Sequence, residues 1–417
     1  MTANSHLVIP KKIAMISLFF FLVIYFLPLI DNLTGALFKL KIMPEGFIGS
    51  PSQIARFSLF IFVIWLVNHT KQEKPLRMIL ITSCYLLLVE ATIACFHLNL
   101  KAFLSGVVFS TKILFALSCY YYTAHWLNSD KEKTVYVIKQ IINYGTFVAI
   151  LVLIAYLSGF HIANYKVGFA TRGLFISGNG LGIVLGISTI FLVHFSKKIT
   201  LITLAHILLL LLTTALLGTK ASIIFLFTAL ILLLIKFFKR APISTLVLIT
   251  VISLYLLIPL IEVLGALFEN IIYKFNNIDD KLTLFASSRD LFIKNAFAQI
   301  KLDDFNALRI LFGGGAYYAY SDYNSGITFL RKSLENDLFE LFFSYGIVMV
   351  IAYIASYIYA LKTLIKKADF IIVLALSLIF IHSITMGHVL FNGTSAITYA
   401  LCLAIAIKGV KVSSNDF

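Results

Sequence analysis

The chain is dominated by apolar runs of about 20 residues, which follow one another with short connections. A helix of that length is what crosses the hydrocarbon core of a bilayer. The sequence therefore predicts a polytopic membrane protein of about 12 transmembrane helices, a number set by the length that each crossing needs. The runs are residues 13–30, 52–68, 78–97, 102–124, 135–158, 178–195, 199–217, 220–237, 243–266, 338–363, 368–389 and 393–409.

Composition supports this reading and fixes the fold class. The chain is 60% hydrophobic and 13% charged, whereas a soluble protein carries about 25% charged residues. The runs lack the in-out alternation of membrane strands, so we expect an all-α fold. No small-x-small cleavage site follows the first run, which is therefore predicted to be a retained helix. Residues 1–417 are expected to form a single transmembrane domain.

The net charge of +15 does not indicate a nucleic-acid partner, because the basic residues are spread over many loops instead of one domain. Their distribution predicts the topology. Most short-loop lysines and arginines fall on the side that holds the N-terminus, which the positive-inside rule assigns to the cytoplasm. Both termini are then cytoplasmic. One long polar loop, residues 267–333 between the ninth and tenth runs, lies outside.

The long loop concentrates the ionisable groups, since ten of the 19 acidic residues fall in it or just after it. Ser287 to Asp290 resemble a helix start. Arg289 at that start could bind a phosphate through its planar guanidinium, or could anchor the helix at the membrane surface. Arg309 and Lys332 are further basic candidates for binding a substrate.

Arg309 opens an apolar stretch that ends in Gly313-Gly314-Gly315. Such glycines let a ligand approach the backbone closely, and a flexible turn explains them equally well. Tyrosines follow at 317, 318, 320 and 323. These rings could stack on sugars or anchor the loop at the interface.

Three acidic residues, Glu335, Asp337 and Glu340, are predicted to open the tenth helix. Acidic side chains favour a helix N-terminus, which explains one of them. Another could act as a general base toward a hydroxyl.

On the same outer side, Lys220 follows a tight turn, and Lys166 and Arg172 lie in the loop 160–177. Each could bind an anion or anchor a helix end. Glu90 and Lys112 lie within apolar runs, where a charge must face the bundle interior or a polar cavity. They could pair with each other. No Cys/His pattern in the sequence indicates a metal site.

Several segments, taken in order, resemble the bacterial O-antigen polymerase and O-antigen ligase superfamily of membrane glycosyltransferases. The matching features are Gly173-Leu174-Phe175-x-x-Gly178-Asn179, the Thr219-Lys220 turn, Arg289 at the loop helix, Leu311-Phe312-Gly313-Gly314-Gly315, and Glu335-Asn336-Asp337 followed by Tyr345-Gly346. Ligases of this superfamily usually carry an arginine after the turn threonine and a His-Asn pair at the helix opening. Here Lys220 and Glu335-Asn336 stand at those positions, which favours a polymerase.

The resemblance implies a transferase of the bacterial inner membrane that needs no metal or cofactor. It implies transfer of a growing glycan from undecaprenyl diphosphate to a lipid-linked repeat unit on the periplasmic face, with a chain-length regulator as a candidate partner. Glu335, Asp337 and Arg289 would be catalytic. Lys220, Arg172, Asn179, Arg309 and Lys332 would bind the substrate. The alternatives are an O-antigen ligase that acts on lipid A-core and, from another class, a lipid-linked sugar flippase.

Overall fold

The computed structural model describes residues 19–44, 47–70, 72–164, 170–197, 200–238, 293–298, 306–319, 334–367 and 369–417. Within these ranges the fold is all-α. The bundle contains α2 (Phe26–Lys39), α3 (Pro51–His69), α4 (Glu73–Phe96), α5 (Leu100–Leu127), α6 (Lys131–Leu157), α7 (Gly178–Phe195), α8 (Leu201–Leu216) and α9 (Lys220–Phe238).

Two short helices, α13 (Asn306–Phe312) and α14 (Gly315–Tyr318), precede three further helices of the bundle: α15 (Asp337–Lys367), α16 (Phe370–Thr385) and α17 (Gly393–Lys408). A 3-10 turn at Ser414–Asp416 ends the chain. In the part of the chain that the structure describes, seven helices are long and apolar enough to cross a membrane, and three more apolar helices are shorter. The expected all-α membrane protein is confirmed at this level. The run 243–266 lies outside the described residues.

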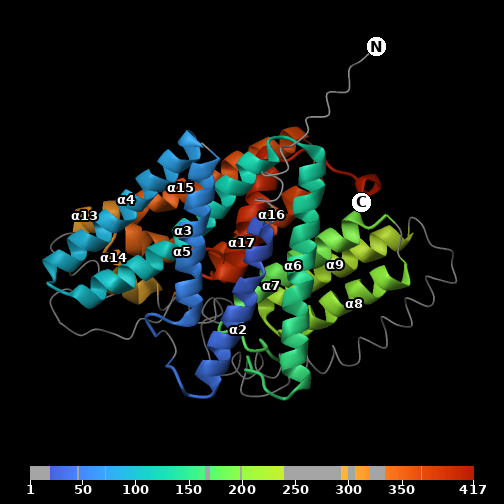
Figure 1. The fold of residues 1–417 in the computed structure, drawn as a ribbon, viewed down its shortest axis with the longest axis horizontal. Coiled ribbons are helices and arrows are strands. Elements are labelled where there is room, and N and C mark those ends of the chain that lie inside the picture. Colours follow the sequence, from blue (N-terminus) through green and yellow to red (C-terminus); the bar gives the residue numbers. More distant parts are fainter. Residues whose placement is uncertain are drawn as a thin grey trace, which may run out of the picture.

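Helix α17 occupies the centre of the bundle (Figure 1) and packs closely along α5. Small residues allow this approach, because Ala396, Ala400 and Ala404 are fully buried and bring no bulk between the helices. Helix α7 packs on α6, α8 and α9 in the same way. A Cβ atom on Gly182 of α7 would be 3.5 Å from the backbone of Ser222 in α9.

Side-chain caps fix where several helices begin. Asn99 accepts a hydrogen bond from the N–H of Ala102 at the start of α5, and Asp130 accepts one from Lys133 at the start of α6. Asn392 does the same for Thr394 in α17. These caps satisfy backbone donors that have no partner inside the helix.

At one end of the bundle, lysines meet helix C-termini. Lys236 donates to the carbonyl oxygen of Val193 at 2.6 Å, and Lys367 donates to that of Gly409 at 2.7 Å. A cation at a helix C-terminus meets unpaired carbonyl groups and the negative end of the helix dipole. Lys131 also pairs with Asp416 at 2.8 Å, which holds the C-terminal turn against the start of α6. We call this the lysine end of the bundle, and the other the loop end.

Candidate functional site

The loop end is organised around Asp337, the first residue of α15, whose side chain is fully buried. One carboxylate oxygen, Oδ2, accepts hydrogen bonds from the backbone N–H of Val389 at 2.9 Å and of Leu390 at 3.3 Å. It also accepts one from the Ser383 hydroxyl at 3.1 Å. Asp337 thereby ties α15 and α16 to the α16–α17 connection, residues 386–392.

Other helices also meet the α16–α17 connection. A Cβ atom on Gly180, in the first turn of α7, would lie 2.6 Å from the side-chain nitrogen of Asn392. The ring of Phe391 stacks on that of Phe109 in α5, with centroids 4.5 Å apart. The connection is therefore held by α5, α7, α15 and α16 together.

The backbone of Glu335 lies against this connection, and its conformation corrects the sequence prediction. Glu335 has φ +54° and precedes the helix, which begins at Asp337. Asn336 caps that helix, since its Oδ1 accepts from the N–H of Leu338 at 3.1 Å. A Cβ on Gly387 would be 2.5 Å from the Glu335 carbonyl carbon. The prediction that Glu335 opens the helix is wrong, because Asn336 supplies the cap and takes that place.

The three acidic residues thus have distinct environments. Glu340 is 2% exposed and accepts a hydrogen bond from the N–H of Leu334 at 2.7 Å. It folds the preceding segment back on the helix. Asp337 is engaged with the α16–α17 connection. Glu335 is only partly buried, so of the three it is the carboxylate accessible to a substrate.

Lys220 lies at the same end of the bundle. It begins α9 after a reciprocal cap, in which the Thr219 N–H donates to the Ser222 hydroxyl and the Ser222 N–H donates to the Thr219 hydroxyl, both at 3.1 Å. Ser222 packs against Gly182 in the first turns of α7. Asn179 belongs to that helix start. The two predicted substrate-binding residues, Lys220 and Asn179, are therefore on neighbouring helix starts.

Arg172 belongs to a loop that folds onto this region. Thr171 forms an antiparallel bridge with Ala163, and its N–H donates to the carbonyl oxygen of Leu216 at 2.8 Å. Leu216 ends α8, directly before the turn that carries Lys220. The structure thus brings Arg172 and Lys220 to the same side of the loop end. Lys166 lies outside the described residues.

Arg309 is buried and holds two backbone segments together. Its side chain is 3% exposed, and its guanidinium donates to the carbonyl oxygens of Tyr318 at 2.8 Å and Ala319 at 3.1 Å. These bonds hold α13 and α14 together and explain the residue without a substrate. Arg289 and Lys332 lie outside the described residues, so their assignments remain predictions. Residues 293–298 are helical, where a loop helix was expected.

Glu90 has a role that the sequence did not indicate. Its carboxylate is 2% exposed and accepts from the N–H of Ala316 at 2.8 Å. Nearby, Asn99 donates to the Tyr318 hydroxyl at 2.7 Å, and the rings of His97 and Tyr318 stack at 4.2 Å. The glycine- and tyrosine-rich segment after α13 is thus docked on the end of α4. The partner of Glu90 could not be found by sequence, because it is a backbone group 226 positions away.

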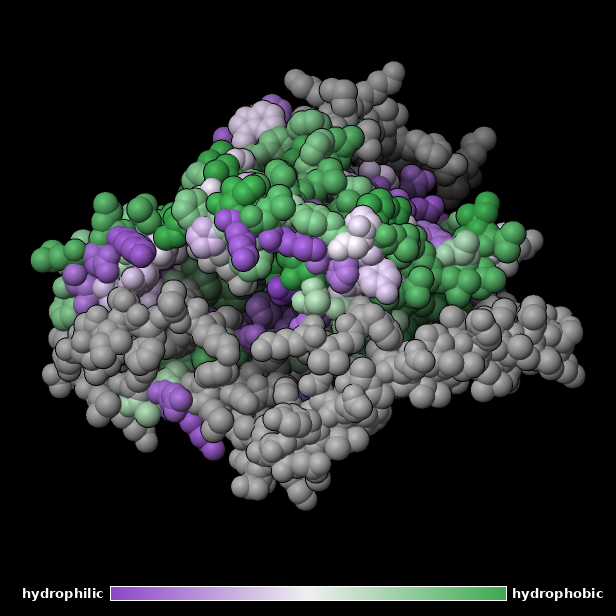
Figure 2. Space-filling model, turned by 90° about the horizontal axis from the view of Figure 1, so that it is seen from below, coloured by the Kyte–Doolittle hydropathy of each residue, from purple (hydrophilic) through white to green (hydrophobic). Residues whose placement is uncertain are grey.

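Among the described residues, the loop end combines the partly buried Glu335, the α16–α17 connection that contacts its backbone, and the cations Lys220 and Arg172 on neighbouring elements. Figure 2 views this end and shows hydrophilic surface in a hollow near the centre of the face. A carboxylate can accept a proton from a hydroxyl, and cations can stabilise a departing phosphate group. No protein-family model matches this chain, and no curated protein matches it either.

Proposed function

We propose that this protein is a polymerase of O-antigen or another surface polysaccharide in the bacterial inner membrane. The observation that carries the proposal is the meeting of Glu335, Asp337 and the α16–α17 connection with the helix starts of Asn179 and Lys220. Residues from four distant parts of the sequence are brought to one end of a membrane bundle. Such a gathering of outer turns supports a site at this end of the bundle, and Arg289 lies outside the described residues.

In the proposed reaction, a sugar hydroxyl of a lipid-linked repeat unit attacks the anomeric carbon of the growing glycan. The bond between that carbon and undecaprenyl diphosphate breaks, and the diphosphate departs with the electron pair. Glu335 takes the proton of the attacking hydroxyl, a contribution of about 10²–10⁴ in rate for a well-placed base. Asp337 holds the turn that carries Glu335, through the α16–α17 connection.

The departing diphosphate carries most of the charge that develops. Lys220, Arg172 and Arg289 are proposed to stabilise it, with Asn179 as a neutral hydrogen-bonding partner. Removing one such preorganised donor from an enzyme site typically costs about 10²–10³ in rate. Arg309 is not included, because its guanidinium is occupied by backbone carbonyl groups.

The proposed topology has 12 transmembrane helices, cytoplasmic termini and a periplasmic loop over residues 267–333. The lysines at the lysine end support this orientation, since the positive-inside rule places them in the cytoplasm. The loop end then faces the periplasm, where a lipid-linked repeat unit would be presented.

Gene deletion separates the proposal from its two alternatives. If the protein is a polymerase, the deletion strain carries single repeat units on its lipopolysaccharide, and the native gene restores the ladder of long chains. A ligase deletion instead accumulates polymer on the lipid carrier. A flippase deletion accumulates repeat units on the cytoplasmic leaflet. Long chains on the lipopolysaccharide of the deletion strain would rule out the proposed function.

A further inference from the structure

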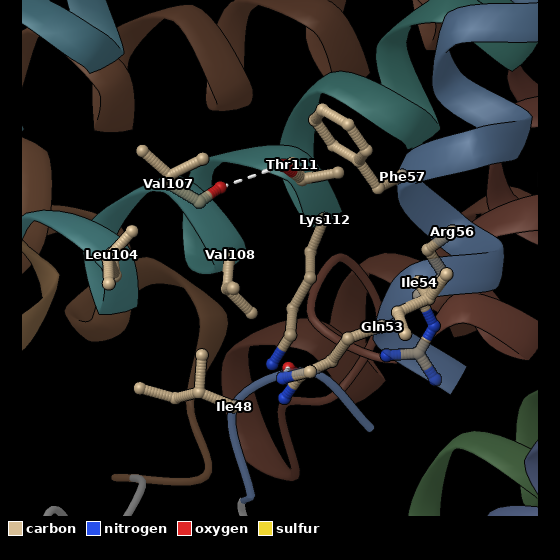
Figure 3. A pocket seen from close by; sticks show the side chains of 11 residues that line it. Ile48, Gln53, Ile54, Arg56, Phe57, Leu104, Val107, Val108, Thr111 and Lys112 are labelled. Carbon is tan, nitrogen blue, oxygen red and sulfur yellow. Dashed lines mark hydrogen bonds between the residues drawn. The ribbon is translucent and has the colours of Figure 1, made fainter. Parts of the chain in front are cut away.

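Asp337 is a buried carboxylate that forms no ion pair with the described residues. The contrast is Asp31, a buried aspartate of α2, whose carboxylate pairs at 3.1 Å with Arg56. Arg56 belongs to α3 and lines an apolar pocket between α3 and α5 (Figure 3). A buried charge is costly unless neighbouring groups compensate it. The groups that hydrogen-bond to Asp337 therefore decide how readily its carboxylate is ionised.

The surroundings of Oδ2 of Asp337 make this oxygen an acceptor. Two of its three partners are the backbone N–H groups of Val389 and Leu390, and an N–H group cannot reverse its direction. A proton on Asp337 would therefore sit on Oδ1, which is buried and accepts no hydrogen bond from the described residues. The third partner of Oδ2, the Ser383 hydroxyl at 3.1 Å, must then donate.

Behind Ser383 lies a chain of two buried tyrosine hydroxyls. The Ser383 oxygen is 2.9 Å from the Tyr353 hydroxyl, which is 3.2 Å from the Tyr357 hydroxyl. Each hydroxyl has one proton to donate. Since Ser383 donates to Asp337, Tyr353 donates to Ser383 and Tyr357 donates to Tyr353. Each bond polarises the next, and the positive ends of all three point toward the carboxylate.

The fold holds these hydroxyls away from water. Ser383, Tyr353 and Tyr357 are 0%, 7% and 1% exposed. The two tyrosines are four residues apart on one face of α15, and their ring centroids are 5.1 Å apart. The ring of Tyr357 also stacks on Tyr399 of α17 at 5.3 Å and meets Phe380 of α16 at 4.5 Å. The chain of hydroxyls therefore lies where α15, α16 and α17 meet.

Other titratable side chains surround Asp337. They are Glu335 and Glu340 on its own segment, His382 on α16, His388 on the α16–α17 connection and Tyr399 on α17. The negative charge of Glu340 opposes the ionisation of Asp337. The hydroxyl chain acts in the other direction, together with the two backbone N–H groups.

We propose that Ser383 and Tyr353, supported by Tyr357, are positioning residues that favour the ionised form of Asp337 and so hold the α16–α17 connection in place. Hydrogen bonds from the chain stabilise the charged form of the carboxyl group more than the neutral form. An ionised Oδ2 in turn binds the two N–H groups of the connection more strongly than a protonated acid does. Loss of a hydroxyl from the chain therefore loosens the connection.

The link to the candidate site runs through Gly387 of the connection. A Cβ atom on Gly387 would be 2.7 Å from the carbonyl oxygen of Glu335, so the connection supports the turn that carries the proposed base. This second step rests on the proposed function, whereas the charge of Asp337 does not.

Infrared spectroscopy of the purified protein tests the first step. A buried protonated carboxyl group has its own carbonyl band, and the part of this band that is lost in Asp337→Asn belongs to Asp337. From about pH 5 to about pH 9, Ser383→Ala should raise the ratio of protonated to ionised Asp337 about tenfold, because a hydrogen bond to a charged group contributes about that factor. Tyr353→Phe keeps the ring and should raise the ratio about threefold, and Tyr357→Phe should raise it less.

Tyr25→Phe is the matched control, because Tyr25 also donates a hydrogen bond inside the bundle, to Gln140 at 2.8 Å, and is outside the chain of hydroxyls. An unchanged ratio in both Ser383→Ala and Tyr353→Phe, or an equal rise in Tyr25→Phe, would overturn the proposal. Hydrogen exchange of a peptide that covers residues 386–392 should be faster in Tyr353→Phe than in Tyr25→Phe. Equal exchange would overturn the link between the charge of Asp337 and the connection.

Polymerisation by Tyr353→Phe in liposomes tests the link to Glu335. We expect kcat to fall about threefold at neutral pH and further on acidification, with KM unchanged, because the variant alters the charge of Asp337 and leaves substrate binding intact. A wild-type pH profile in Tyr353→Phe would contradict this link. If wild type makes no polymer while the infrared ratios change as expected, the proposed function fails and the assignment of the hydroxyl chain stands.

Discussion

Gly313 and Gly346 interlock where α13 crosses the kink of α15. Each has a positive φ, +83° and +72° respectively. A Cβ atom on Gly313 would overlap the backbone of Ser344 and Tyr345, and one on Gly346 would overlap the backbone of Leu311 and Phe312. The N–H of Gly314 donates to the carbonyl oxygen of Phe343 at 2.9 Å. Gly313 of the long loop is thus explained by backbone packing against the helix that carries Asp337.

Substitution of either glycine should disrupt the packing of α13 on α15 and destabilise the protein. Gly346→Ala adds a strained φ and a backbone overlap, and we expect a loss of more than about 2 kcal/mol of stability. Gly159→Ala is the control, because Gly159 also has positive φ but nothing within 4 Å of its Cβ position, so about 1 kcal/mol is expected there. Thermal unfolding in detergent measures both. Equal shifts for the two variants would contradict the interlock.

Arg289 and Arg309, both in the long loop, should behave differently when replaced. Arg289→Ala is expected to abolish polymer at a normal protein level, and Arg289→Lys should rescue it only in part, because an ammonium lacks the bidentate fork. Arg309→Ala should lower the protein level and the unfolding temperature, since two buried carbonyl groups lose their donor at about 1–3 kcal/mol. Immunoblots beside polysaccharide gels separate the two. Full polymer in Arg289→Ala would remove Arg289 from the site.

The loop that carries Arg172 should loosen on acidification. Partial burial and the Lys39 ammonium lower the pKa of His161 below its usual value. Lys39 donates to the His161 carbonyl oxygen at 2.6 Å, and the imidazole Nδ1 is 2.9 Å from the Thr171 hydroxyl. A lowered pKa means that the unfolded loop binds more protons. The stabilisation is therefore complete above the unfolded value of about 6.5 and is lost as pH falls through the folded value.

Hydrogen exchange of peptides that cover residues 158–164 and 170–177 at pH 7.5 and pH 5 measures this effect, after correction for intrinsic rates. Protection should fall at pH 5. In Lys39→Gln the loss should be smaller, because without the nearby positive charge the folded pKa of His161 lies closer to the unfolded value. Equal protection at both pH values would contradict the role of His161.

Topology offers a separate prediction. A reporter fused after Arg240 should be cytoplasmic, and one fused between Gly313 and Ser325 should be periplasmic, because the short-loop lysines and arginines obey the positive-inside rule. Alkaline phosphatase is active only in the periplasm. Activity at the first position, or none at the second, would reverse the proposed orientation.

The helices could be predicted from the sequence because each membrane-spanning helix needs a run of about 20 apolar residues, which is a strong and local signal. The sequence predicts that Arg172, Lys220 and Glu335 lie on the same side of the membrane, but it does not predict which of them are close together. The kink at Gly346, the cap by Asn336 and the link between Glu90 and Ala316 depend on contacts between distant segments. No local pattern encodes such contacts, so the sequence alone predicts a helical Glu335 and does not reveal the contact between Glu90 and Ala316.

Reconstitution tests the central claim, that Glu335 is the base of a polymerase, most directly. The purified protein in liposomes is supplied with a lipid-linked repeat unit, and the length of the glycan chains is followed by mass spectrometry. Only variants whose unfolding temperature equals that of the wild type are compared. Wild type should extend chains and release undecaprenyl diphosphate. Glu335→Gln should lower the rate at least about 100-fold with substrate binding nearly intact, and Asp337→Asn should lower it less. Chains made by Glu335→Gln at the wild-type rate, or loss only in Asp337→Asn, would contradict the account.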